Sequence, residues 1–290
     1  MIEAYFVHIL ILVCIYVILA VSLNIALGYT GLLNMGHIAF FGIGAYTSAL
    51  LTKAGTPYII ALFAAGILAS LMGCILVYAT RKLKGDYLAL ATLGFSFVVY
   101  SLMLNWTSLT RGALGIPGIS KPCFFGLCIA NNNEFLVFAL IITALTVFII
   151  YRIANSNFGR LLQAARDDEL GLRVLGKNTF KLKMKSMMIS AFFAGIAGSL
   201  FAHYISYIDP GSFMMNEVIL VFTIVIVGGL ASIRGSIVAT FIIIIIPELL
   251  RLVALPSSIL GPARQIIYAV ILIAILLLRP KGLFGRIDLE

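Results

Sequence analysis

The sequence predicts an all-α, polytopic integral membrane protein: a single domain over residues 1–290 with about nine transmembrane helices. Hydrophobic residues make up 62% of the chain and charged residues only 11%, whereas a soluble domain carries about 25% charged residues. A chain with a mean hydropathy of +1.13 cannot cover itself with polar surface, so lipid must be its solvent. The apolar residues also fall into runs near the roughly 20 residues that cross a bilayer.

The runs predict nine spans, and their edges allow a range of eight to ten. In order, the expected spans are residues 5–27, 33–52, 58–80, 87–106, 134–151, 186–207, 216–230, 236–252 and 264–278. The seventh run is short for a crossing, so a tilted or re-entrant element is the alternative there. The glycine-rich stretch 28–44 also allows a break into two half-helices.

The basic residues predict the orientation. Four connections, at residues 81–84, 152–185, 234 and 279–286, hold fifteen of the 20 Lys and Arg residues, and nine spans place all four on one side. Cytoplasmic loops carry such an excess of positive charge. We therefore expect an outside N-terminus and a cytoplasmic C-terminus. The first span lacks a basic leader and a small-residue cleavage site, so we expect it to be retained.

The sequence predicts no catalytic residue, metal site or cofactor in this chain. No Walker A phosphate loop is present, and the three histidines lie far apart. Cys123 and Cys128 share the expected extracytoplasmic loop 109–133, where a disulfide and two free thiols are both open readings. No third or fourth ligand accompanies them for a metal. The net charge of +9 lies in the connections, which is not a nucleic-acid pattern.

Seven short motifs occur one after another along the chain. They are GYTGLLNMGH (28–37) continuing to Tyr46, GDYLALATLG (85–94), GALGIPG (112–118), NSNFGR (155–160), AARDDE (164–169), GGLASIRG (228–235) and RPKGLFG (279–285). Together they resemble the permeases of branched-chain amino acid ABC transporters, of the LivM type. The resemblance covers residues 23–285, although the loop with Cys123 and Cys128 matches no part of the family pattern.

The resemblance implies a permease subunit of an inner-membrane importer for leucine, isoleucine and valine. Such a subunit is not itself an enzyme. It would work with a homologous second permease, two cytoplasmic ATPase subunits that bind ATP and Mg²⁺, and a soluble substrate-binding protein. Some relatives of such systems carry other amino acids, amides or urea. The alternatives are an ion-coupled secondary transporter and a passive channel for a small solute, neither of which copurifies with an ATPase.

The segment 152–185 is a charged island between two apolar runs, with eight of the 20 basic residues and three of the 11 acids. Its pattern predicts one amphipathic helix over residues 160–175, ended by Gly171 or Gly176. Leu161, Leu162 and Leu172 would supply its apolar contacts. We expect this helix to couple the permease to the ATPase; a solvated loop that only fixes topology is the alternative. The candidate coupling residues are Arg160, Ala165, Arg166, Asp167, Asp168, Glu169 and Gly171.

Polar residues within the spans are candidates for the translocation pathway. They are Asn24, Tyr29, Asn34, His37, Thr92 and Ser96. Broken helices expose polar groups to a cavity in many carriers, but tight packing at glycines and local hydroxyl bonds explain the same pattern. Glu217 is expected at the outer start of the seventh span. Glu248 and Arg251 are three residues apart, so we expect them to pair.

Overall fold

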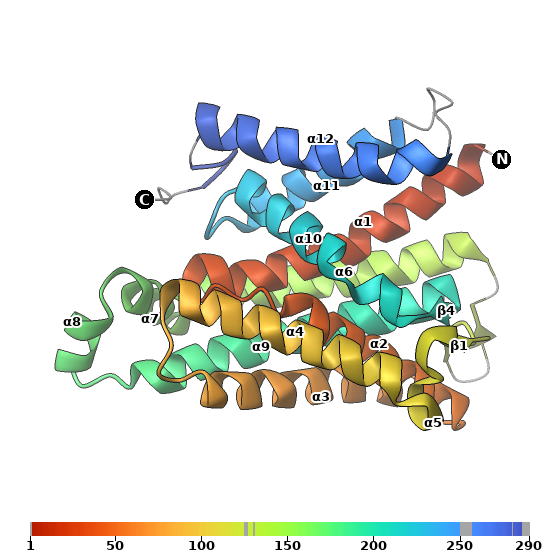
Figure 1. Ribbon diagram of the computed structural model, residues 1–290, viewed down its shortest axis with the longest axis horizontal. Coiled ribbons are helices and arrows are strands. Elements are labelled where there is room, and N and C mark those ends of the chain that lie inside the picture. Colours follow the sequence, from red (N-terminus) through yellow and green to blue (C-terminus); the bar gives the residue numbers. More distant parts are fainter. Residues whose placement is uncertain (1, 125–126, 130, 250–256, 280, 286–290) are drawn as a thin grey trace.

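A computed structural model of the chain is a bundle of apolar helices (Figure 1). It describes residues 2–124, 127–129, 131–249, 257–279 and 281–285. In this part, six apolar segments of 19 to 27 residues are long enough to cross a membrane. Two further apolar helices are shorter, and the helix His37–Lys53 has 17 residues, which together is consistent with about nine spans. The nine helices are α1 (Ile2–Asn24), α2 (His37–Lys53), α3 (Tyr58–Ala79), α4 (Gly85–Asn105), α6 (Asn132–Ala154), α9 (Thr179–Ile205), α10 (Met215–Gly228), α11 (Ile233–Leu249) and α12 (Ser257–Leu278).

Short elements connect these helices. A π-helix, η1 (Ile25–Tyr29), continues α1, and α7 (Asn157–Asp167) and α8 (Glu169–Val174) follow α6. The other connections contain α5 (Thr107–Thr110), η2 (Gly112–Leu114) and η3 (Pro210–Phe213). Strand β1 (Ile116–Pro117) pairs antiparallel with β4 (Tyr207–Ile208), and β2 (Cys123–Phe124) pairs with β3 (Leu127–Cys128). In that second ladder Cys123 is the Cα partner of Cys128, and Cys123 is disulfide-bonded.

Several predicted helix boundaries differ from the structure, and α12, for example, begins at Ser257 rather than at residue 264. The second helix begins at His37 rather than at residue 33, because residues 31–36 are not helical and Gly31 has a φ of 71°. Residues 31–36 thus connect η1 to α2, and α2 itself is continuous from His37 to Lys53. Helix α9 begins at Thr179, seven residues before the predicted start, so three lysines that were expected in a loop lie on its first turns. Helix α10 has only 14 residues, as its short apolar run predicted.

Close packing of α2 and α3 on α9 forms the centre of the bundle. Gly195 of α9 faces the backbone of α3, where an added Cβ would lie 2.6 Å from the Ala65 carbonyl oxygen. On the α2 side, Gly44 packs against the backbone of Gly195, and Gly198 packs against the backbone of Phe41. Glycine lets helix backbones approach this closely inside a membrane. The three helices therefore form a rigid unit that ends in the charged segment.

The charged connections gather at one end of the bundle, as the sequence predicted. The 81–84 connection, α7, α8 and residues 281–285 lie there, and the N and C marks are at opposite ends (Figure 1). Lys84 Nζ lies 3.8 Å from a Glu169 carboxylate oxygen. The amides of Leu283 and Phe284 donate to the carbonyls of Val227 and Gly228 at 2.9 and 3.1 Å. We call this the basic end of the bundle; β1 and α5 mark the opposite end.

Candidate functional site

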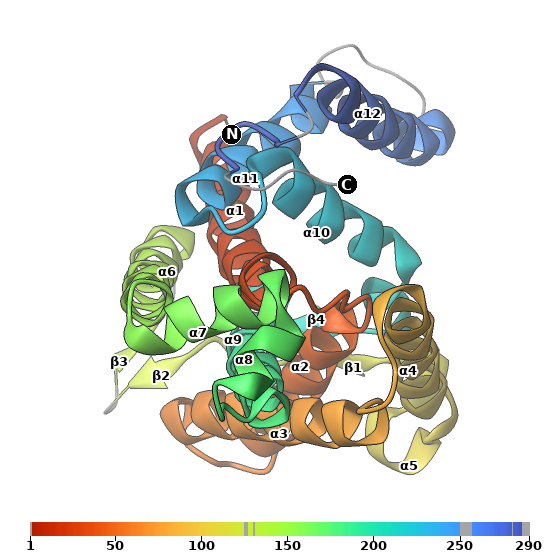
Figure 2. The same ribbon diagram turned by 90° about the vertical axis from the view of Figure 1, so that its left-hand side faces the viewer.

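The predicted amphipathic helix over residues 160–175 is two helices, α7 and α8, which meet at an angle at the basic end (Figure 2). The break is at Asp168, whose backbone is extended (φ −147°, ψ 95°). Its carboxylate accepts a hydrogen bond of 2.9 Å from the Gly171 amide and so caps α8. An aspartate that bonds forward to the backbone starts a helix instead of continuing one, which is why a single helix was the wrong expectation.

The end of α8 is set by Gly176, one of the two glycines that the sequence offered. Gly176 has a φ of 74°, a left-handed conformation that favours glycine. Its amide donates to the Arg173 carbonyl at 2.9 Å, and the Lys177 amide donates to the Leu172 carbonyl at 3.2 Å. This pair of bonds is a Schellman motif, which satisfies the last carbonyls of the helix. Gly171 instead lies in the first turn of α8.

The apolar side chains of α7 and α8 divide into an inward and an outward group. Leu162 and Leu172, with Ala165, are at most 6% exposed and pack on the protein's own core. Leu170, Val174 and Leu175 are 68%, 87% and 75% exposed. The outward group was not selected from the sequence, because amphipathicity alone does not tell which apolar residues a neighbouring helix will cover. These three residues form what we call the α8 apolar tip.

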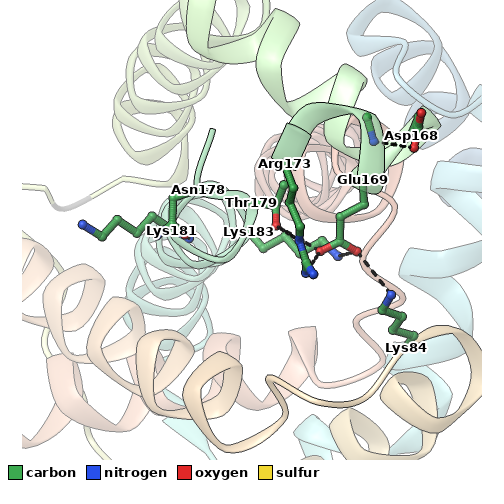
Figure 3. Close-up of polar contacts among 9 residues, drawn as sticks. Lys84, Asp168, Glu169, Arg173, Asn178, Thr179, Lys181 and Lys183 are labelled. Carbon is green, nitrogen blue, oxygen red and sulfur yellow. Dashed lines mark hydrogen bonds and ion pairs between the residues drawn. The ribbon is translucent and has the colours of Figure 1, made fainter. Parts of the chain in front are cut away.

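Glu169 ties α8 to two other elements (Figure 3). One carboxylate oxygen accepts a 2.5 Å bond from Arg173 and a 3.1 Å bond from the Thr179 hydroxyl. The other accepts a 2.8 Å bond from Lys183 on α9 and faces Lys84 before α4 at 3.8 Å. The side chain is only 15% exposed. Its contacts therefore fix α8 against α9 and close to α4.

The surroundings of Glu169 keep its carboxyl ionised. Burial alone raises the pKa of this group, but the hydrogen bond and charge of Lys183, followed by the bonds from Thr179 and Arg173, outweigh it and lower the pKa to about 2. The neighbouring Lys181 points away from the carboxylate (Figure 3). Glu169 is consequently an anion at every physiological pH, and the link between α8 and α9 is permanent rather than titratable.

Arg166 joins α7 to the end of α1. Its Nη1 donates a 2.7 Å hydrogen bond to the carbonyl of Gly28 within η1, and its Nη2 lies 2.7 Å from the Asp167 carboxylate. Gly31, just after η1, packs on the Arg166 side chain, since an added Cβ would lie 2.8 Å from Arg166 Cγ. π-Helices are rare and often occur at functional sites. The charged segment thus contacts the point where α1 departs from α-helical geometry.

A cavity of about 290 Å³ lies between these contacts. The 30–32 loop, the 81–85 connection and the elements α7 to α9 line it. Its lining contains the cations Arg81, Lys84, Arg166, Arg173 and Lys183, with Glu169 as the single acid in the described part. Six of the seven predicted coupling residues lie on α7 and α8, and Asp168 lies at the break between them, but their roles differ. Arg160 bonds Asn157 on its own helix, and the side chain of Asp167 is 65% exposed.

Two of the six predicted pathway residues, Asn24 and His37, make hydrogen bonds between helices. Asn24 is buried against α11 and the turn that precedes it. Its Nδ2 donates to Ser236 Oγ at 2.7 Å, and its Oδ1 accepts from the Ala231 amide at 2.9 Å. His37 Nε2 lies 3.2 Å from the Leu19 carbonyl oxygen and 3.1 Å from Ser22 Oγ. These contacts connect α1 to α11 and α2.

The other four lie near the loop before α2. Thr92 Oγ1 accepts from the Met35 amide at 3.0 Å, Ser96 donates to the Met35 carbonyl at 3.3 Å, and Tyr29 is buried. Asn34 Oδ1 accepts from the Gly36 amide at 3.1 Å. In the described part, Asn34 Nδ2 and His37 Nδ1 are buried without a hydrogen-bond partner. Their role in the pathway stays a prediction. The expected pair of Glu248 and Arg251 lies outside the described side chains.

Comparison with known proteins places these observations in a family. Residues 5–278 match the family model of the branched-chain amino acid transport system permease component. The high-affinity branched-chain amino acid transport system permease protein LivM of Escherichia coli K12 is 36% identical over 264 residues, which are 83% of this chain and 62% of that protein. The match therefore spans less than two thirds of that relative.

Two other relatives are covered almost completely. A probable LivM of Methanocaldococcus jannaschii is 26% identical over 92% of this chain and 90% of its own length. The permease LivH of Salmonella typhimurium is 28% identical over 95% and 92%. No solved structure matches the chain. The match to the family model, over residues 5–278, includes the charged segment.

Proposed function

The chain belongs to the family of branched-chain amino acid transport permeases, and we propose that it is one membrane subunit of an ATP-driven importer for branched-chain amino acids. The observation that carries this proposal is the charged segment at the basic end, where α7 and α8 are bonded to α1 and α9. A passive pore has no need of such an element. A permease driven by a soluble ATPase needs a rigid docking element that is connected to its spans.

We propose that the α8 apolar tip is the docking element. Leu170, Val174 and Leu175 expose apolar area at the basic end, and an exposed apolar cluster rimmed by charge is typical of a protein interface. The bonds of Glu169 and Arg166 hold this tip in a fixed relation to α9 and to η1. Movement of an ATPase subunit against the tip would then pass to the spans by these two routes, through one ion cluster and one hydrogen bond.

The partners follow from the same proposal. ATP and Mg²⁺ would be bound by two separate ATPase subunits at the basic end, which we place in the cytoplasm because cytoplasmic connections are enriched in Lys and Arg. LivM and LivH are both permease proteins of high-affinity branched-chain amino acid transport systems, and this chain is similar to both. This similarity supports pairing of this chain with a homologous second permease. A soluble protein would deliver the substrate at the opposite end, where the N-terminus lies.

Copurification tests the docking assignment. The full assembly is expressed with Leu170, Val174 and Leu175 all changed to Ser, and with Leu114→Ser as the control, since Leu114 is 76% exposed at the opposite end. We expect the triple variant to retain the second permease but to lose ATPase subunits at least tenfold, with the control unchanged. Retention of the ATPase by the triple variant would refute the docking role of the tip.

Transport assays test the proposal as a whole. In proteoliposomes that hold the full assembly and the binding protein, we expect ATP-dependent uptake of leucine that isoleucine and valine inhibit and that urea does not. Uptake driven by a proton or sodium gradient, in liposomes that hold this chain alone, would instead identify an ion-coupled carrier. Competition by urea as strong as that by leucine would shift the substrate to small amides.

A further inference from the structure

Helix α10 begins near the middle of the bundle. Tyr16 is the central residue of the 27-residue apolar segment Glu3–Tyr29, and its hydroxyl donates a 2.6 Å hydrogen bond to the carboxylate of Glu217 in the first turn of α10. Helix α10 forms only part of the 19-residue apolar segment Pro210–Gly228. Its fourteen residues rise about 21 Å, against a hydrocarbon core of about 30 Å. Glu217 therefore lies near mid-depth and not at the outer surface, where the sequence placed it.

The Glu217 carboxylate opens onto a cavity of about 330 Å³ formed by α1, α10, α11 and α12. Its lining includes the polar residues Asn216 and Gln265 and the aliphatic residues Leu12 and Ile244. Ligand pockets measure roughly 300 to 1,000 Å³, so this volume suits a small solute. The mixture of one carboxylate, two amides and aliphatic walls matches a small molecule with a polar head and an apolar tail.

Glu217 has capacity for a further partner. Within the part of the chain that the structure describes, its one hydrogen-bond donor is Tyr16, and no cation lies within ion-pair distance. A carboxylate has about four acceptor sites. An ionisable group at this depth is costly to bury and marks a pathway or a ligand more often than packing. The polar residues near α2 contrast with it, because their bonds are largely internal.

We propose that this cavity is a mid-membrane subsite that receives the ammonium group of the transported amino acid at Glu217. The aliphatic side chain of the substrate would lie against Leu12 and Ile244, and the amides of Asn216 and Gln265 would face its carboxylate. This inference rests on the proposed function and adds a selection rule to it. A solute that lacks a cationic nitrogen, such as urea or a neutral amide, leaves the Glu217 carboxylate without a partner and is rejected.

Substitution of the carboxyl tests the subsite in the reconstituted assembly. Glu217→Gln keeps the size of the side chain and its bond to Tyr16 but removes the charge, so we expect leucine uptake to fall at least tenfold while ATPase copurification is unchanged. Glu217→Asp retains the charge and should keep more uptake than Glu217→Gln. The matched control is Glu3→Gln, an exposed acid in the first turn of α1. Normal uptake by Glu217→Gln, with wild-type uptake intact, would overturn the subsite alone. Failure of the wild type to import leucine would overturn the proposed function.

A labelling measurement decides the matter if Glu217→Gln does not assemble. Asn216→Cys places a thiol at the wall of the cavity, and its reaction with a small maleimide is followed in the full assembly. We expect leucine delivered by the binding protein, with ATP present, to slow this reaction at least threefold, and urea to leave it unchanged. Equal labelling with and without leucine would overturn the subsite.

Discussion

Arg166 on α7 donates a hydrogen bond of 2.7 Å to the backbone carbonyl of Gly28, 138 residues earlier in the chain. The acceptor lies in η1, where the backbone has π-helical rather than α-helical geometry. A π-turn leaves carbonyls that the regular i to i−4 ladder does not use. The guanidinium supplies a donor for one of them and holds Asp167 with its other nitrogens. The end of α1 and the charged segment are therefore directly connected, and we call this connection the Arg166 joint.

Arg166→Lys is expected to weaken this joint. Lysine lacks the planar guanidinium group, so its single ammonium cannot bond the Gly28 carbonyl and the Asp167 carboxylate with two separate nitrogens. A hydrogen bond from a charged donor contributes about 1.5–3 kcal/mol, so thermal unfolding of the purified protein should shift to lower temperature, and leucine uptake per ATP hydrolysed should fall. Arg152→Lys, at an exposed position of α6, is the control. Equal effects of both substitutions would contradict the prediction.

The three adjacent acids should differ in importance. Glu169→Gln removes the charge that Lys183 and Arg173 share and should cost about 1.5–3 kcal/mol. Asp168→Ala removes the cap of α8, at about 1 kcal/mol. Asp167→Asn weakens an ion pair in which Asp167 itself is 65% exposed, at about 0–1 kcal/mol. Unfolding midpoints and ATP-coupled uptake should fall most in Glu169→Gln, less in Asp168→Ala and least in Asp167→Asn. The largest fall in Asp167→Asn would contradict the prediction.

Stability at low pH should depend on Glu169. The pKa of its carboxyl is about 2 in the folded protein and 4.5 as an ordinary glutamate. A group with a depressed folded pKa stabilises fully above the ordinary value, and this contribution is lost as the pH falls through the folded value. Between pH 4.5 and 2 the wild type should therefore lose its advantage over Glu169→Gln, whereas between pH 6 and 8 the difference should be constant. Unfolding midpoints of both proteins across this range check the prediction. A difference that changes between pH 6 and 8 would contradict it.

Gly36, before α2, and Gly42, within it, should differ in how well they tolerate substitution by a residue with a side chain. A Cβ on Gly36 would lie 2.8 Å from the backbone oxygen of Thr92, which cannot yield, whereas one on Gly42 would meet the flexible end of Met103 at 2.9 Å. We expect Gly36→Val to reduce the yield of folded protein strongly and Gly42→Ala to reduce it mildly. Gly94→Ala is the control, since nothing lies within 4 Å of its added carbon. Size-exclusion profiles and uptake measure the outcome.

The helical bundle was predictable because hydropathy is a property of the sequence itself. The nine apolar helices, the shared end of the charged connections and the short α10 all follow from apolar runs and positive charge. The break at Asp168 had a readable signal, because Asp followed three residues later by Gly allows a side-chain cap. The lysines at 181, 183 and 185 concealed the true start of α9, since charged residues extend a helix beyond the lipid as easily as they form a loop.

The mid-depth position of Glu217 was not predictable in this way. Hydropathy locates a helix along the chain and does not say at what depth it starts, and the partner that fixes that depth, Tyr16, is 201 residues away. The division of apolar residues on α7 and α8 has the same cause. Whether Leu172 or Leu170 is covered depends on α9, which packs on α8 and is not contained in the local pattern.

The contact of residues 281–285 with the end of α10 has a practical consequence. The Leu283 and Phe284 amides satisfy the Val227 and Gly228 carbonyls, and an added Cβ on Gly282 would lie 2.6 Å from the Ile226 carbonyl oxygen. A purification tag or fluorescent reporter that replaced these five residues would leave the Val227 and Gly228 carbonyls without these donors. Tags are better fused ahead of α1.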